Sequence, residues 1–319
     1  MKRRWKIALG VVALLAAVMV TLPLVRNRES YDRAELAQAH PELAHSFLDA
    51  PAGTTHYELM PGRGDIVVMV HGVSGPMNVW DRTCAALHEA GRSYVRVDLY
   101  GRGLSARLDS GAYDLPTYRD QVLAVVEHVT PGKRVHLVGS SMGALVVSEV
   151  AKSLGAARVR SVTFMGPAGF RLEATPASRA IGVPLLGDWM MTSFGDALLR
   201  KHQRRYFVQP DRFEAQHAVF DEQLRVRGSK RAILETMRRV PLQRYEDGYR
   251  ALAATAIPAI AFWGEDDQAF PFVHAPELRR AMPALELVPI SRAGHLPQLE
   301  RDDLVSPRFL AWLEAHEAL

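Results

Sequence analysis

The sequence has very little cysteine: Cys84 is the only one in 319 residues. No disulfide can form within the chain, and the distance from Cys84 to the N-terminal apolar run excludes lipid attachment there. Cysteine–histidine clusters and glycine-rich phosphate loops are missing too, so we expect neither a metal nor an organic cofactor. There is no internal repeat, and a content of 48% apolar and 23% charged residues argues against a disordered or fibrous chain.

A basic surface for nucleic acid is also missing, although the net charge is +4 and the pI is near 9.3. Residues 1–30 hold six lysines or arginines against one glutamate, a net +5, which leaves −1 for the rest of the chain. The body is therefore close to neutral, and we expect no nucleic-acid partner.

The basic N-terminal segment contains an apolar run from Ile7 to Val25. As a helix, these roughly 19 residues would span about 28 Å, close to the thickness of a bilayer core. Four cations precede the run, so residues 1–30 are predicted to be an uncleaved membrane anchor with the catalytic body on the extracytoplasmic side. The alternative is a cleaved signal and a secreted protein, but the nearest small-x-small site, Ala37-Gln38-Ala39, lies well beyond the run. A buried core helix fits less well.

Downstream, short continuous apolar runs alternate with amphipathic stretches. This pattern is typical of a mostly parallel sheet covered by helices on both faces, an α/β fold. Strands are expected at residues 66–70, 93–98, 134–138, 159–165, 257–263 and 285–289. Residues 31–53 read as a linker, residues 54–168 and 251–319 as the core, and the proline-broken residues 169–250 as a helical cap. Such an insertion should lie over the carboxyl ends of the strands, where open α/β sheets bind ligands.

One of these strands runs into the sequence Gly139-Ser140-Ser141-Met142-Gly143, after which an apolar helix begins. Glycines two residues before and after a serine allow the tight strand-to-helix turn that exposes a nucleophilic hydroxyl. Only Ser141 has both glycines, so it is the candidate nucleophile, and Ser140 is assigned to packing.

A second turn, His71-Gly72-Val73, follows the strand at residues 66–70. A His-Gly turn in this position can supply an oxyanion donor through the backbone N–H of the residue after glycine. The predicted oxyanion hole is thus formed by the N–H groups of Val73 and Met142, with His71 in a structural role.

With these two turns the chain resembles the α/β-hydrolase superfamily, in its lid-bearing branch of esterases and monoacylglycerol-lipase-like enzymes. The loop at residues 98–105 is similar to the family's Asp-x-x-Gly-x-Gly-x-Ser turn, a scaffold element without assigned chemistry. The resemblance implies a triad in the order Ser, acid, His. A turn like the family's Trp-Gly-x-x-Asp indicates Asp267 as the acid, with Glu265 and Asp266 as competitors, and a C-terminal Gly-His indicates His295 as the base.

A serine nucleophile disfavours the relatives that use an aspartate, so the expected activity is hydrolysis of a small to medium-chain or monoacylglycerol-like ester through an acyl-enzyme. The cap residues Met190, Met191 and Phe194 are candidates for substrate binding, or else they form the cap's own core. Two alternatives remain: a carbon–carbon bond hydrolase of the same fold, and a catalytically dead membrane-anchored binding protein. The oligomeric state is left open.

Overall fold

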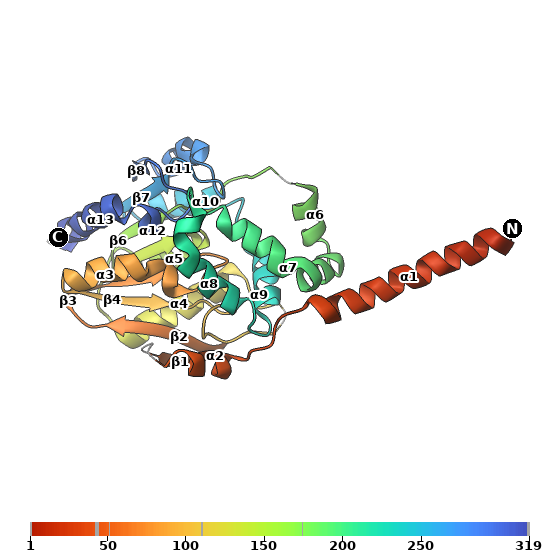
Figure 1. The fold of residues 1–319 in the computed structure, drawn as a ribbon. Coiled ribbons are helices and arrows are strands. Elements are labelled where there is room, and N and C mark those ends of the chain that lie inside the picture. The colour runs from red at the N-terminus through yellow and green to blue at the C-terminus, as the bar shows by residue number, and fades with distance from the viewer. Residues whose placement is uncertain (1, 42–44, 51, 110, 174, 318–319) are drawn as a thin grey trace.

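One eight-stranded sheet forms the centre of the molecule (Figure 1). The structure is a computed structural model that describes residues 2–41, 45–50, 52–109, 111–173 and 175–317. The strands are β1 (Ser46–Ala50), β2 (Gly53–Met60), β3 (Arg63–Val70), β4 (Arg92–Val97), β5 (Val135–Ser140), β6 (Val159–Met165), β7 (Ala259–Gly264) and β8 (Glu286–Ile290).

The spatial order of the strands is β1-β2-β4-β3-β5-β6-β7-β8. Strands β3 to β8 are parallel to one another, whereas β2 pairs in an antiparallel manner with both β1 and β4 at one edge. In the centre, Val68 of β3 pairs with Val95 on one side and Leu137 on the other, and all three are fully buried. Strands buried on both faces explain the continuous apolar runs, and the mostly parallel sheet predicted from them is confirmed.

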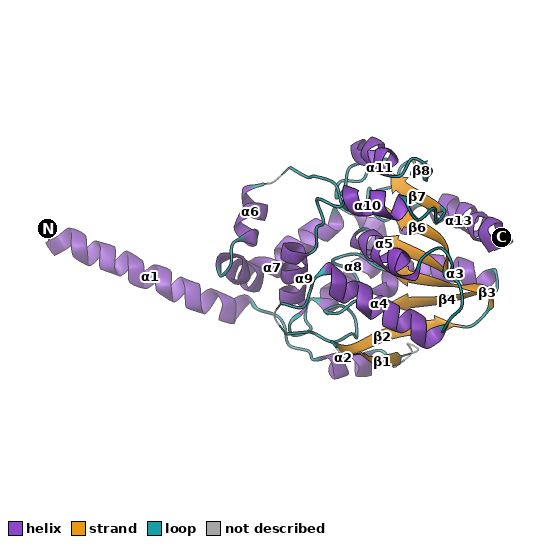
Figure 2. Cartoon of the chain, turned by 180° about the vertical axis from the view of Figure 1, so that it is seen from behind, coloured by secondary structure: helices purple, strands orange, loops and turns teal. Residues whose placement is uncertain are grey.

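Helices cover both faces of the sheet (Figures 1 and 2). The helices are α1 (Lys2–Arg26), α2 (Arg33–Ala39), η1 (Met77–Trp80), α3 (Asp81–Glu89), α4 (Leu115–Val129), α5 (Met142–Leu154), α6 (Pro176–Gly182), α7 (Leu186–Arg204), η2 (Pro210–Phe213), α8 (Glu214–Gln223), α9 (Ser229–Arg239), α10 (Glu246–Ala253), η3 (Phe272–His274), α11 (Ala275–Ala281), α12 (Pro297–Glu300) and α13 (Asp302–Glu317). Helices α3 and α13 pack together on one face, and α4 and α5 pack together on the other.

Helices α6 to α10 lie between β6 and β7 in the chain. Four of their buried side chains, Met191, Leu199, Phe220 and Ile233, belong to a small apolar core that is separate from the main one. This core lets the inserted helices, here called the cap, hold together as a layer at one end of the sheet (Figure 2).

Helix α1 projects away from the body and is unburied in the structure (Figure 1). Among the described residues it is the one helix long and apolar enough to cross a membrane, a test that a signal sequence also passes. The cap helix α7 touches α1 near the C-terminal end of α1.

Residues 31–53, predicted as a linker, contain the helix α2 and the strand β1. Residues 46–50 form the edge strand β1, whose alternating half-exposed side chains give no continuous apolar run to read in the sequence. Before it, α2 begins with a reciprocal cap: the Asp32 carboxylate accepts the Glu35 N–H, and the Glu35 carboxylate accepts the Asp32 N–H. Leu36 of this helix packs with Leu104 of the core and Val226 of the cap.

The Leu36 contact predicts that α2 contributes to the stability of the folded body. Leu36→Ala should lower the free energy of unfolding by about 2–3 kcal/mol, because it removes a buried side chain from a small apolar cluster. The measurement is urea unfolding of a variant pair that lacks residues 1–26. Leu304→Ala, at a position 42% exposed, is the matched control and should change little. Equal, small effects of the two substitutions would show that α2 does not dock.

Candidate active site

Ser141 lies at the junction of β5 and α5, on a backbone that L-residues rarely adopt. Its φ is 55° and its ψ is −119°. Strain of this kind is tolerated only where the surrounding structure determines the conformation, and such residues cluster at functional sites. The first turn of α5 starts at Met142, directly after Ser141, so unpaired N–H groups of a helix N-terminus lie beside the hydroxyl.

The glycines around Ser141 are required by close backbone packing. A Cβ at Gly139 would collide with the Gly143 carbonyl, and a Cβ at Gly143 would collide with the Val70 carbonyl. A Cβ at Gly72 would lie 2.9 Å from the Ser141 Cβ. The spacing that suggested the nucleophile is therefore explained by sterics: the turn, the end of β3 and the start of α5 fit together only without these side chains.

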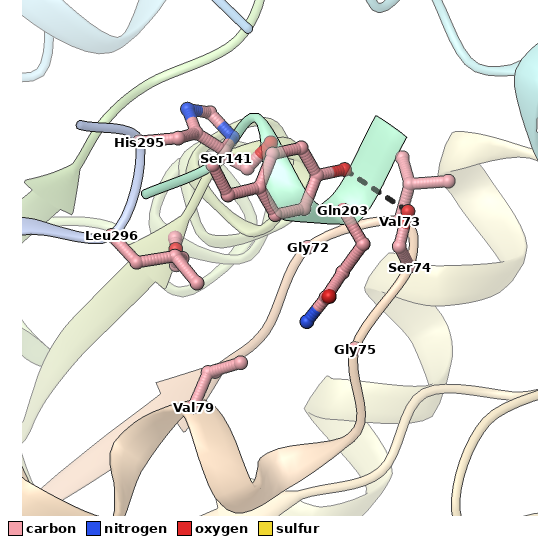
Figure 3. A pocket seen from close by; sticks show the side chains of 11 residues that line it. Gly72, Val73, Ser74, Gly75, Val79, Ser141, Gln203, His295 and Leu296 are labelled. Atoms are coloured by element: carbon pink, nitrogen blue, oxygen red, sulfur yellow. Dashed lines mark hydrogen bonds between the residues drawn. The ribbon is translucent and has the colours of Figure 1, made fainter. Parts of the chain in front are cut away.

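His295 and Asp267 are joined by a hydrogen bond of 2.8 Å between Nδ1 and Oδ2, and both are buried. The other carboxylate oxygen of Asp267 accepts the backbone N–H groups of Ala269 and Phe270 at 2.7 and 2.9 Å. Because an ionised carboxylate only accepts, His295 donates from Nδ1, and in the neutral imidazole the other nitrogen, Nε2, carries the lone pair. Ser141 and His295 line the same small cavity (Figure 3).

The competing acids do not reach the histidine. Glu265 and Asp266 are exposed, whereas Asp267 is 4% exposed and is bonded to His295. A Cβ at Gly264 would collide with the carbonyls of Ala293 and Gly294, so this glycine lets the turn that carries Asp267 approach the turn that carries His295.

His71 fixes the direction of the peptide that follows it. Its Nε2 accepts the Leu99 N–H at 2.9 Å, so Nδ1 must carry the proton that it donates to the Gly72 carbonyl at 2.7 Å. In a trans peptide the Val73 N–H points opposite to that carbonyl, away from His71. The next carbonyl, that of Val73, accepts a hydrogen bond of 2.8 Å from the buried Arg102. Both bonds orient the Gly72–Val73 turn, which lines the cavity at Ser141.

That cavity is small, with a volume of about 30 Å³. This is room for one or two waters and too little for an ester. Its walls, shown in Figure 3, are Gly72, Val73, Ser74, Gly75, Val79, Ser140, Ser141, Gln203, Tyr206, His295 and Leu296. Tyr206 shares a hydrogen bond of 3.0 Å with Ser74, and its backbone carbonyl accepts the His295 N–H at 2.7 Å. Burial raises the pKa of Tyr206 to about 12, which keeps the phenol protonated.

Three features of this site were not anticipated in the sequence. Gln203 and Tyr206 come from the end of the cap helix α7 and the residues after it, and Arg102 comes from a loop that had been assigned no chemistry. Arg102 also donates to Thr236 of α9, so it joins the Gly72–Val73 turn to the cap. The arginine within the turn motif at residues 98–105 is the one signal that sequence inspection could have used.

Met190, Met191 and Phe194, predicted to bind substrate, are not brought to Ser141. Met191 is buried in the small core of the cap, and Phe194 packs against Trp189 with the Arg26 guanidinium 5.4 Å from its ring centre. None of the three is among the residues that line the cavity. Their apolar character is explained by packing within the cap and against α1, the alternative already open in the sequence.

Within the described residues, no group of three or more His, Cys, Asp or Glu side chains is arranged to hold a metal ion.

The model of the Alpha/beta hydrolase family matches residues 67–308, and the chain belongs to this family. Its sequence is 30% identical over 266 residues to a dihydrolipoyllysine-residue acetyltransferase component of an acetoin cleaving system from Pseudomonas putida; the match covers 82% of this chain and 66% of that relative, slightly under two thirds of its length. It is 22% identical to Lipase 1 of Psychrobacter immobilis over 80% of this chain and 78% of the lipase.

Among solved structures, the fold is similar to the crystal structure of a membrane phospholipase A described as a bacterial virulence factor. The TM-score is 0.69 at 19% identity, and the match covers 99% of each chain. At this identity the likeness shows the shared fold, including the long N-terminal segment.

The hydrogen bonds of His71 predict a neutral imidazole with the proton on Nδ1. Burial lowers the pKa of His71 to about 4, since the charged form loses its hydration. In ¹H–¹⁵N NMR spectra of the histidine rings, the His71 signals should therefore stay those of the neutral Nδ1–H form from pH 8 down to about pH 5. A spectrum of His71→Asn assigns the signals. A titration midpoint near pH 6.5 would contradict the buried, two-bonded geometry.

Proposed function

We propose that this chain is a serine hydrolase of carboxylic esters that works through an acyl-enzyme. The proposal rests above all on the buried His295–Asp267 pair, whose histidine lines the same cavity as a serine on a strained strand-to-helix turn. Ser141 is the proposed nucleophile, His295 the general base, and Asp267 the carboxylate that orients the imidazole.

The proposed reaction follows from the protonation of these groups. His295, neutral and free at Nε2, takes the proton of Ser141 as the hydroxyl oxygen attacks the ester carbonyl. Asp267 stabilises the imidazolium, and the N–H groups of Val73 and Met142 bind the oxyanion. The imidazolium then gives the proton to the departing alcohol. Water, deprotonated by the same imidazole, attacks the acyl-enzyme and releases the acid.

The substrate class we favour is a lipid-like ester with one small to medium acyl chain, such as a monoacylglycerol. Two comparisons support it: a relative named as a lipase, and a structure named as a membrane phospholipase A whose match extends over almost the whole chain. Because the cavity is too small for an ester, we expect the lining residues Gln203 and Tyr206 to move aside when the substrate enters.

We also infer that α1 anchors the protein in a membrane. Its stretch from Arg4 to Arg26 is long and apolar enough to span, and the cations before it favour a cytoplasmic N-terminus with the catalytic body on the other side. If the segment is a cleaved signal instead, mature protein would lack it, which mass spectrometry of the native protein would reveal.

The assigned roles predict the effect of removing the nucleophile. Ser141→Ala should abolish labelling by a fluorophosphonate probe and lower kcat for p-nitrophenyl butyrate by at least about 10⁴-fold. Asp267→Asn should cost on the order of 10⁴-fold, because it would favour the wrong imidazole tautomer. The test uses protein lacking residues 1–26 and esters of increasing chain length.

Labelled protein that is inactive on every ester would point to the alternative, hydrolysis of carbon–carbon bonds. A folded wild-type protein that the probe does not label would show that the site is catalytically inactive, as expected for a membrane-anchored binding protein.

The contact between Tyr206 and Ser74 predicts a second, milder effect. Tyr206→Phe removes this bond but keeps the ring against His295, so the cap should open more easily. We expect kcat/KM for octanoyl esters to rise about threefold to tenfold relative to acetyl esters, the usual worth of one neutral hydrogen bond. Tyr113→Phe, which removes a buried hydroxyl bond at Leu108 outside the cavity lining, is the matched control. Identical chain-length profiles for the two variants would show that this bond does not restrain the cap.

A further inference from the structure

Helix α1 contains a carbonyl that its own backbone cannot satisfy. Pro23 lies inside the helix and has no N–H, so the Met19 carbonyl four residues earlier loses its usual donor. The indole N–H of Trp189, in the cap, donates to this carbonyl at 3.0 Å. In a hydrocarbon environment no water could take that role, and an unpaired carbonyl would be costly. The cap therefore completes the hydrogen bonding of the apolar helix.

The position of this bond places the cap beside the apolar part of α1. Met19 lies six residues before Val25, which is about 9 Å along a helix. Figures 1 and 2 both show the start of α7 next to the final turns of α1, and the two helices are in contact. Arg26, at the end of α1, lies over the ring of Phe194 of α7, a second contact at the level where the helix would leave a bilayer.

The turn between α6 and α7 presents apolar side chains without cover. Val183, Leu185 and Leu186 are 49%, 84% and 40% exposed, and Leu185 adopts a positive φ of 63°. The turn is nevertheless firmly held: Asp188 accepts the Leu185 N–H at 3.0 Å and pairs with Arg238 at 3.0 Å. Strained backbone that holds a leucine out of the protein gains nothing in water, but it is favourable if the side chain is buried in lipid.

We propose that residues 183–189, the docking edge, insert into the membrane interface beside α1, with Trp189 bonded to the Met19 carbonyl. The partner is the lipid bilayer itself, and the inference rests on the proposed membrane anchoring of α1. A depth of about 9 Å is within the range at which apolar faces of interfacial segments lie. Helix α7 carries Trp189 near its start and Gln203 near its end. The same helix therefore connects the bilayer to the cavity at Ser141.

Insertion can be measured with a fluorophore at Leu185. Full-length Ser141→Ala, Leu185→Cys protein is labelled with an environment-sensitive dye and reconstituted into phosphatidylcholine vesicles. The native Cys84 is buried, and burial raises its pKa to about 12, so it should not react. Val273→Cys is the matched control, since Val273 is 74% exposed and precedes α11, which lies away from α1 (Figure 1). We expect iodide to quench the dye at position 185 severalfold less than at position 273, and a lipid-borne quencher to show the reverse.

The role of the Trp189 bond is tested by a double-mutant cycle on the same readout. Trp189→Phe removes the N–H but keeps an aromatic ring, so it should increase iodide access to position 185 severalfold. Pro23→Ala gives the Met19 carbonyl a donor within α1, so the carbonyl no longer needs the indole, and Trp189→Phe should have a much smaller effect in that background.

Each other outcome overturns the proposal in a distinguishable way. Equal iodide access at positions 185 and 273, in protein that floats with the vesicles, would show an anchored protein whose docking edge stays in water. Protein that does not float would refute the anchoring. Additive effects in the cycle, or an unchanged Trp189→Phe variant, would show that Trp189 does not bond the freed carbonyl. Because the protein carries Ser141→Ala, none of these results depends on the proposed esterase activity.

Discussion

The whole site depends on how closely three backbone turns pack around Ser141. The end of β3, the junction of β5 with α5, and the paired turns of Asp267 and His295 meet where side chains would collide with carbonyl groups. Glycine alone fits at the contact positions, and the serine between them is forced to a φ of 55°. The tight contact thus accounts for a strained residue with its hydroxyl at the cavity rather than within the helix.

Hydrogen bonds between buried polar groups stabilise the turns that meet at Ser141. Asp98 is 2% exposed and accepts hydrogen bonds from His56 and from the N–H groups of Met77 and Leu104. Burial acts to raise the pKa of Asp98, but the bond from His56 and the neighbouring charges outweigh it and lower the pKa to about 2. The next residue, Leu99, donates to His71, which itself donates to the Gly72 carbonyl. The loop at residues 98–105 therefore helps to orient the Gly72–Val73 turn, which lines the cavity at Ser141.

The cap connects the apolar helix α1 to the cavity at Ser141. Its helix α7 contacts α1 through Trp189 and Phe194 at one end and reaches the cavity with Gln203 at the other. The apolar residues that stand out in its sequence serve packing within the cap and against α1, and the residues beside Ser141 are a glutamine and a tyrosine. A small cavity lined partly by the cap, whose helix α7 contacts an apolar helix, suits the proposed ester that arrives from a lipid phase.

The features that could be predicted from the sequence are those that depend on contacts between residues close together in the chain. The nucleophile turn at Ser141 and the parallel strands could be predicted because glycine sterics and continuous apolar burial act over a few neighbouring residues. The half-buried edge strand β1 could not, since its pattern makes sense only beside β2. Likewise, Gln203 and Tyr206 reach the cavity at Ser141 through the way the cap folds back over the sheet. These choices belonged to the tertiary structure alone, because contacts between residues distant in the chain leave no local trace in the sequence.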